Sequence, residues 1–328
     1  SMEKIAANFY MLTLPMPFRL GHVHAFLLVH NDRITLFDTG LNTPETFLHF
    51  EESLHSIGKE IRDIERILIT HYHIDHCGLA GRLQDISGAA IYMSEWSRPF
   101  IMVQNGGDSA FMDRIATFCR RHGLPAKAIT FIAGLLGTFK KAGSSFTINS
   151  FYRGEQREVV GGREMMILST PGHTHDHLSF FFPRERVLLS GDHVLPEITP
   201  NLSPDLFAPD FRPLRSFLDS LSRVERLPIA MVCPAHGRPF TDIRERIAEI
   251  RAHHEVRKSL TLASVQGGAK TAFMVSQDIF GTDLNEFDQF LALNETYVHL
   301  VELLHEELIR EEYADDLATY HDCRDSGA

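Results

Sequence analysis

The sequence predicts an α+β fold in which a large strand-containing part is followed by a helical C-terminal unit. Short apolar runs with the length and composition of β-strands recur up to residue 233, and several end in loops that carry His or Asp. Segments with helical spacing lie between these runs and dominate after residue 242. A length of 328 residues suits one large domain with an appended unit, or two domains.

The N-terminal region predicts strands joined as hairpins, followed by a helix. The apolar stretches, which are separated by turns, lie at residues 9–14, 24–29 and 34–37. The last stretch runs into Asp38, which either caps the following turn or orients a metal-binding histidine. Residues 43–57 then show helical spacing, with Thr43 and Pro44 suited to the N-cap and the first helical position.

The strongest motif, HxHxDH, follows the apolar run at residues 66–70. It places four metal-binding side chains within six residues, namely His71, His73, Asp75 and His76. Alternate residues of an extended backbone point to the same side, so His71 and His73 can bind one ion. Asp75 and His76 are then available for a second ion.

A helical insertion is predicted after this motif. Residues 78–85 have the pattern of a helix and residues 89–93 that of a short strand. Residues 95–139 are rich in Phe and Met, lack strand alternation and are interrupted by glycines. We expect two or three helices here, whose apolar side chains either pack in a core or line a substrate pocket.

Strand patterning returns after the insertion, and the loops that follow the strands again carry metal-binding residues. The predicted strands are residues 145–148, 164–169, 180–182, 186–189 and 229–233. Loops at the ends of neighbouring strands meet at one edge of a sheet. The expected metal ligands are therefore His71, His73, Asp75, His76, His173, Asp192 and His236. This set suits two metals that share a carboxylate and keep open coordination positions, as catalytic metals do.

Several other histidines have less defined roles. His175 and His177 stand beside His173, but three histidines on one tight turn cannot all face the same ion, so we do not expect these two to be ligands. His193 follows Asp192 and suits a position behind the ligands or facing the substrate. The histidines of the first hairpin lie either at the rim of the site or on the ordinary surface.

The C-terminal part is predicted to be helical and acidic. Helices are expected at residues 242–265, 271–280 and 285–312, and together they resemble a degenerate winged-helix unit. The segment from residue 268 onward contains fourteen Asp and Glu residues and three Lys and Arg residues. Since such a surface repels nucleic acid and anionic membranes, we expect this unit to pack on the catalytic domain or to form a homodimer contact. The predicted domains are residues 1–255 and 256–328.

Composition narrows the cellular setting. No apolar run has the length of a membrane helix, and the N-terminus lacks the pattern of an export signal. The four cysteines are far apart and form no CxxC pair, which indicates neither a disulfide framework nor a zinc ribbon. We expect a cytoplasmic protein.

The motif order HxHxDH, TPGH, GD and PAHG resembles that of the metallo-β-lactamase-fold hydrolases, and among them the glyoxalase II-like and lactonase-like branch with two metals. The resemblance covers residues 8–255 and implies an αββα sandwich with the site at one edge. It implies one metal on His71, His73 and His173, a second metal on Asp75, His76 and His236, and a bridging position for Asp192. True metallo-β-lactamases place a cysteine where this chain has Asp192, which argues against antibiotic hydrolysis.

The expected activity is hydrolysis of an ester, thioester or lactone by a metal-bridging hydroxide. Two divalent ions, zinc with manganese or iron as alternatives, lower the pKa of a shared solvent molecule from about 15.7 toward 7. Asp75 and Asp192 are the expected catalytic residues, and Asp75 holds or relays the proton for the leaving group. The Phe-rich and Met-rich insertion favours a small-molecule substrate with an apolar acyl part. The alternatives are a phosphodiesterase or endoribonuclease, an iron-dependent persulfide dioxygenase, and a metal-binding module without activity.

Overall fold

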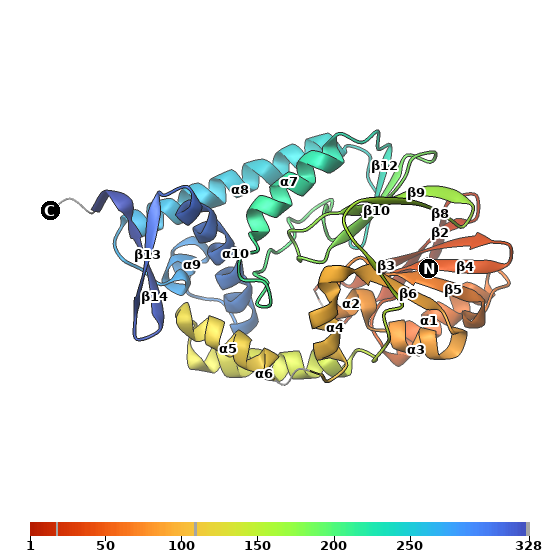
Figure 1. The fold of residues 1–328 in the computed structure, drawn as a ribbon, viewed down its shortest axis with the longest axis horizontal. Coiled ribbons are helices and arrows are strands. Elements are labelled where there is room, and N and C mark those ends of the chain that lie inside the picture. Colours follow the sequence, from red (N-terminus) through yellow and green to blue (C-terminus); the bar gives the residue numbers. More distant parts are fainter. Residues whose placement is uncertain (18, 108–109, 326–328) are drawn as a thin grey trace.

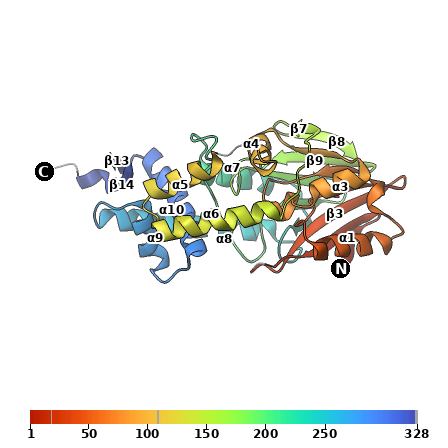
Figure 2. The ribbon, with the colours of Figure 1, turned by 90° about the horizontal axis from the view of Figure 1, so that it is seen from below.

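Two β-sheets packed face to face form one end of the molecule, on the right in Figure 1, and helices cover their outer faces (Figures 1 and 2). The computed structural model describes residues 1–17, 19–107 and 110–325. The predicted αββα sandwich is confirmed. Within these described ranges, no helix is both long and apolar enough to cross a membrane.

The described strands form two large sheets and one small sheet. The first has the strand order β1-β2-β3-β4-β5-β6-β7, with β1 (Met2–Ala6), β2 (Phe9–Pro15), β3 (His22–His30), β4 (Arg33–Phe37), β5 (Ile64–Leu68), β6 (Ala90–Ser94) and β7 (Ser150–Tyr152). The second has the order β12-β11-β10-β9-β8, with β8 (Gln156–Val160), β9 (Arg163–Ser169), β10 (Leu178–Phe182), β11 (Val187–Gly191) and β12 (Met231–Pro234). A separate hairpin joins β13 (Ile309–Ala314) to β14 (Leu317–Asp322).

The helices lie in three groups. The first sheet is covered by α1 (Pro44–His55) and α3 (Ala80–Ser87), and α2 (Ile74–Cys77) forms part of the HxHxDH loop. The insertion contains α4 (Arg98–Gln104), α5 (Phe111–Arg121) and α6 (Ala126–Lys141). The second sheet is covered by α7 (Pro213–Glu225) and the first half of α8 (Ile243–Gln266), and the C-terminal part adds α9 (Ala272–Phe280) and α10 (Glu286–His305). Three short 3₁₀ turns complete the described elements: Ile61–Asp63, Glu95–Ser97 and Cys323–Asp325.

Strand β10 shows why the sheets stack. Successive side chains of a strand point to opposite faces, and the run Leu-Ser-Phe-Phe-Phe is apolar on both. Phe180 and Phe182 pack between the sheets, where Phe180 meets Phe37 edge to face with ring centres 5.1 Å apart. Phe181 faces the other way, into the layer formed with α7 and α8. A strand buried on both faces requires a partner sheet and a covering helix.

The insertion and the C-terminal helices share one apolar core. Ile115 and Cys119 of α5 and Ile132 of α6 pack with residues of α9, α10 and the β13–β14 hairpin. In Figure 1, α5 and α6 lie beside α9 and α10, away from the two sheets. Phe111, Met112 and Phe118 pack partly buried against this core, whereas Met102 and Phe131 are exposed, so the predicted core alternative holds for part of the Phe-rich and Met-rich stripe. The boundary between residues 255 and 256 stays a prediction, and α8 runs through that position.

Several sequence predictions differ from the structure. Strands β1 and β8 were not predicted, and the strand expected at residues 145–148 lies instead at Ser150–Tyr152, where it extends the first sheet. The helix expected at residues 285–312 ends at His305 because Glu307 has a φ of +56°, outside the helical region. The chain then enters the β13–β14 hairpin. The helix ends beside Glu307 and not beside a glycine, so the glycine that usually indicates a helix C-terminus in the sequence was missing.

Candidate metal centre

A buried carboxylate at the end of the neighbouring strand hydrogen-bonds to the HxHxDH loop and fixes its conformation. Asp38, directly after β4, has a φ of +59°. It accepts hydrogen bonds of 2.8 Å from the backbone N–H of Thr70, from the Thr70 hydroxyl and from Nδ1 of His76. The sequence left two roles open for Asp38, capping the following turn or orienting a metal-binding histidine, and the structure shows the second. His76 Nδ1 therefore carries a proton, and its Nε2 faces the centre.

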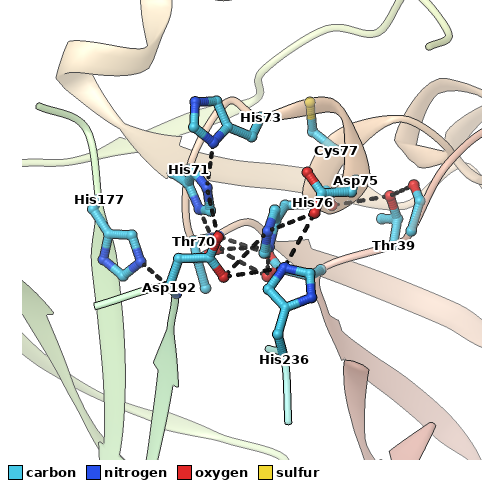
Figure 3. A network of polar contacts seen from close by, with 12 residues as sticks. Thr39, Thr70, His71, His73, Asp75, His76, Cys77, His177, Asp192 and His236 are labelled. Carbon is cyan, nitrogen blue, oxygen red and sulfur yellow. Dashed lines mark hydrogen bonds and ion pairs between the residues drawn. The ribbon is translucent and has the colours of Figure 1, made fainter. Parts of the chain in front are cut away.

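The first group of ligand atoms comes from the HxHxDH loop, the β9–β10 loop and the end of β11. His73 Nδ1 lies 3.1 Å from both His71 Nε2 and His173 Nε2. One carboxylate oxygen of Asp192, Oδ2, lies 3.3 Å from His173 Nε2 and 3.9 Å from His71 Nε2. These four side chains together have a geometry that could hold an ion, and Figure 3 shows His71, His73 and Asp192 of this group.

The second group adjoins the first through the other oxygen of Asp192. Asp75 Oδ2 lies 3.3 Å from His76 Nε2 and 3.2 Å from His236 Nε2. Asp192 Oδ1 lies 3.5 Å from His76 Nε2 and 3.4 Å from His236 Nε2. Asp75, His76 and His236 form a set that could hold a second ion. The structure thus brings all seven predicted residues together, with Asp192 between the two sets, and Figure 3 shows six of the seven.

The donor atoms fit divalent ions better than hydrogen bonds. His76 Nε2, His236 Nε2 and Asp192 Oδ1 are buried and have no hydrogen-bond partner among the described residues. Such atoms normally are hydrogen-bonded or bind a metal. Ligands that bind zinc at about 2.0–2.1 Å in a tetrahedron lie roughly 3.3–3.5 Å apart, close to the separations seen here. The residues therefore fit the metals that the motif order implies.

Backbone carbonyls fix the orientation of two candidate ligands. His173 Nδ1 donates to the carbonyl of Asn201 at 2.6 Å, and His236 Nδ1 donates to the carbonyl of His22 at 2.8 Å. His71 Nδ1 lies 2.9 Å from the Thr70 hydroxyl, which already donates to Asp38 and so accepts from His71. In each ring the proton on Nδ1 leaves Nε2 free to bind a metal.

The two sets differ in charge. Burial, aided by His173, lowers the pKa of His73 to about 3, so this ring is neutral. Burial also opposes a charge on His76, but Asp75, Asp192 and Asp38 outweigh it and raise the pKa of His76 well above its usual value. Burial would raise the pKa of Asp192, yet His76 and His236 hold it well below its usual value. Buried carboxylates therefore demand positive charge at the second set, which divalent ions would supply.

His177 is buried and holds the backbone of Asp192. The Asp192 N–H donates to His177 Nε2 at 3.1 Å, so Nδ1 carries the ring proton and donates to the Thr170 hydroxyl at 2.8 Å. Gly191 has a φ of +52°, and a Cβ there would lie 2.6 Å from His177 Nε2. Only glycine lets the chain pass this close to the ring. His177 is thus not placed as a ligand, as predicted, but supports one.

His175 turns away from the two sets toward a different partner. Its Nδ1 lies 2.7 Å from Asp205 Oδ2, and its ring stacks on Trp96 and on Phe211 with ring centres 4.1 Å apart in each case. Asp205 was not predicted as a residue of this region. No local motif points to it, because it reaches His175 from a loop thirty residues later in the chain.

The remaining histidines lie behind or beside the ligands. His193 is fully buried against Phe217 and His177, so it does not face a substrate. His24 contacts the PAHG loop, since its Nε2 lies 2.8 Å from the Gly237 carbonyl. His22 accepts from Gly237 N–H at 3.2 Å. Two histidines of the first hairpin therefore support the loop that carries His236.

Comparisons with known proteins agree with this architecture. The chain is 31% identical over 306 residues to the probable metallo-hydrolase YqjP of Bacillus subtilis (strain 168), covering 91% of this chain and 92% of that protein. Over 245 residues it is 24% identical to the Beta-lactamase-like protein 2 homolog of Caenorhabditis elegans, covering 74% of this chain and 65% of that protein.

Solved structures show the same fold over nearly the whole chain. A metallo-beta-lactamase family protein from Thermus thermophilus superposes with a TM-score of 0.85 at 27% identity, covering 97% of this chain and 100% of that one. A beta-lactamase domain protein from Burkholderia ambifaria gives a TM-score of 0.86 at 26% identity, with 98% and 94% covered. The family model described as Metallo-beta-lactamase superfamily matches residues 18–236, and the chain belongs to this superfamily.

Proposed function

We propose that this protein is a binuclear metal-dependent hydrolase that cleaves a carboxylic ester, thioester or lactone. The observation that carries the proposal is the placement of Asp192, whose two carboxylate oxygens face the two ligand sets separately. A bridging carboxylate of this kind has little purpose with one ion. Membership of a superfamily whose relatives include a metallo-hydrolase supports hydrolysis as the reaction class.

The protein side chains divide the work between binding and proton transfer. His71, His73 and His173 would hold one divalent ion and Asp75, His76 and His236 the other, with zinc the best fit to these nitrogen and oxygen donors. When bound, such ions supply Lewis acidity and an activated water molecule at neutral pH. Asp75, whose side chain is 19% exposed, is the most accessible carboxylate of the centre. It would hold the proton that passes to the leaving group.

A row of aromatic rings supports a substrate with an apolar acyl part. Tyr72 lies between two candidate ligands and stacks on Phe100 with ring centres 3.8 Å apart. Phe100 meets Phe207 at 5.1 Å, and Phe207 stacks on Phe111 at 5.3 Å. These rings join the ligand loop to the insertion, so an acyl chain leaving the centre along the rings would lose contact with water.

The proposal is tested by metal analysis together with a panel of substrates. Protein prepared without chelator should contain two transition-metal ions at the centre, and esters, thioesters or lactones should be hydrolysed faster than phosphodiesters or single-stranded RNA. Asp192→Ala should lower both metal content and turnover, because it removes an oxygen ligand from each set. Asp85→Asn, an exposed change on α3, is the matched control. One fully occupied ion with Asp192 turned away would remove the binuclear mechanism.

A further inference from the structure

A second cluster of metal-binding side chains lies outside the centre, where α8 and α10 pack together. Glu295 of α10 faces two adjacent histidines of α8 (Figure 1 shows both helices). Its Oε1 lies 3.7 Å from His253 Nε2 and 4.0 Å from His254 Nδ1. One ligand atom from each of the three residues lies within 4.8 Å of the others.

The Glu295 carboxylate is largely buried among imidazole rings. Glu295 is only 8% exposed. In the part of the chain that the structure describes, no Lys or Arg pairs with it, and the two imidazole nitrogens facing it lie beyond hydrogen-bond distance. A buried charge in this state calls for a cation.

The cluster is more widely spaced than the candidate metal centre, but its distances to Glu295 still allow one shared ion. Two ligands that each bind an ion at about 2.1 Å can lie at most roughly 4.2 Å apart, and both distances to Glu295 are within that limit. His254 Nδ1 also lies 3.1 Å from His299 Nε2, the separation found between His71 and His73 at the centre. Imidazole nitrogens that face one another at this distance beside a carboxylate are typical of ligands around one ion.

His299 is oriented as a ligand would be. Its Nδ1 donates to the backbone carbonyl of Glu295, one helical turn earlier, at 2.6 Å. The ring proton is therefore on Nδ1, and Nε2 directs a lone pair toward His254. His253 is the most exposed member, with 36% of its side chain accessible, so an ion has a route in from solvent.

We propose that His253, His254 and Glu295 bind one transition-metal ion of the zinc class, with His299 Nε2 as the adjoining fourth donor. Two nitrogens and a carboxylate oxygen are donors that zinc accepts. The ion would cross-link α8 to α10 within the C-terminal helices. This site does not depend on the proposed function, because none of its residues belongs to the candidate metal centre.

The test compares metal content and the positions of bound ions. Purified full-length protein is equilibrated with one added Zn²⁺ per site and then freed of loose metal. Wild type should carry one more zinc per chain than Glu295→Gln and His253→Asn, while His305→Asn, an exposed change on the same helix as Glu295, should keep the full number. Anomalous scattering at the zinc edge should show a peak between α8 and α10 in the wild type.

The alternative is that these three side chains bind no metal ion. Equal zinc content in wild type and both variants, or an anomalous map with peaks at the hydrolytic centre and none at Glu295, would overturn the proposal. If Glu295→Gln fails to fold, the zinc content of His253→Asn alone tests the proposal. His253 is partly exposed to solvent, so its replacement removes fewer buried contacts. Loss of ester hydrolysis would not count against this site. A failure of the metal-site proposal can therefore be distinguished from a failure of the proposed function.

Discussion

At the scale of single residues, the candidate metal centre is organised by carboxylates that are buried beside imidazoles. Asp38 and Asp192 are 3% and 7% exposed, and each accepts or faces several donors. Burial alone would raise the pKa of Asp192, whereas His76 and His236 lower it, so the ionisation of Asp192 depends on neighbouring positive charge or on metal. The residues that orient the ligands are therefore as important as the ligands.

Asp38→Asn should weaken metal binding at the second set. The amide group cannot accept from Thr70 and His76 in the way the carboxylate does, so His76 loses the bond that fixes its Nδ1 proton. Loss of such a supporting group typically lowers metal affinity or activity about 10-fold to 100-fold. Competition with a chromophoric chelator measures the change, and Asp85→Asn is the control. Unchanged affinity would mean that Asp38 only shapes the turn.

His177→Asn and His177→Gln should differ. Gln can place an acceptor near the position of Nε2, which binds the Asp192 N–H, whereas Asn reaches only the position of Nδ1. We expect His177→Asn to lower metal content and kcat by about 10-fold to 100-fold and His177→Gln to lower them less. Metal analysis and steady-state kinetics check this. Equal losses in both variants, matched by equal losses of Tm, would indicate a purely structural role.

At the scale of elements, the insertion and the C-terminal helices depend on each other. The apolar faces of α5 and α6 are covered by α9, α10 and the β13–β14 hairpin, and Lys127 of α6 pairs with Glu286 at the start of α10. The exposed ion pair contributes little by itself. The stability of this region therefore comes mainly from the shared apolar core, and changes in either part should affect both.

Acyl chain length should control turnover if the aromatic row guides the substrate. Each additional methylene buried against the rings contributes about 0.8 kcal/mol, or about a fourfold rise in kcat/KM. Phe111→Ala removes the ring that stacks on Phe207 and should flatten this dependence, whereas Phe131→Ala, an exposed residue of α6, should not. A series of p-nitrophenyl esters provides the measurement. A flat wild-type response, with Phe111→Ala only losing stability, would show that the row is core.

His122 should make the packing of the insertion sensitive to acid. Burial, with Arg121 adding to it, lowers the pKa of His122 to about 3 from an ordinary value of 6.5. The folded pKa is depressed, so the neutral ring's contribution is fully present above pH 6.5 and is lost as the pH falls toward 3. At pH 4 the resulting loss of unfolding free energy amounts to about 3 kcal/mol.

His122→Phe should therefore reduce the loss of unfolding free energy between pH 7 and pH 4. Denaturant unfolding at the two pH values measures this, with the exposed change His55→Gln as control. The Phe ring can keep the contacts that His122 makes with Phe118 and Tyr297. An identical pH dependence in wild type and His122→Phe would contradict the prediction.

At the scale of the whole molecule, charge separates the two ends of the chain. The formal net charge is −11, and the segment after residue 267 alone accounts for that value. The acidic side chains there lie on α10 and the β13–β14 hairpin, next to the helices of the insertion. Such a surface suits packing against basic side chains of the same chain and opposes phosphate backbones.

The full-length protein should not bind nucleic acid at physiological ionic strength. Phosphate neutralisation dominates such affinity, and the C-terminal unit lacks the basic stripe that would provide it. Fluorescence anisotropy with labelled single-stranded RNA and duplex DNA at several salt concentrations measures this. Salt-sensitive binding near micromolar affinity would overturn the prediction and favour the phosphodiesterase alternative.

The sequence alone predicted the candidate ligand set, because local motifs encode that set, and the order of these motifs implied the layered fold. Each candidate ligand directly follows an apolar strand, so the strand pattern also predicts which side chains reach the edge of the sandwich. Only the tertiary structure decided how those ligands are held. Asp38 and the carbonyls of His22 and Asn201 act across long stretches of chain. A backbone carbonyl is the same in every residue, so no sequence pattern marks the one that a histidine will find.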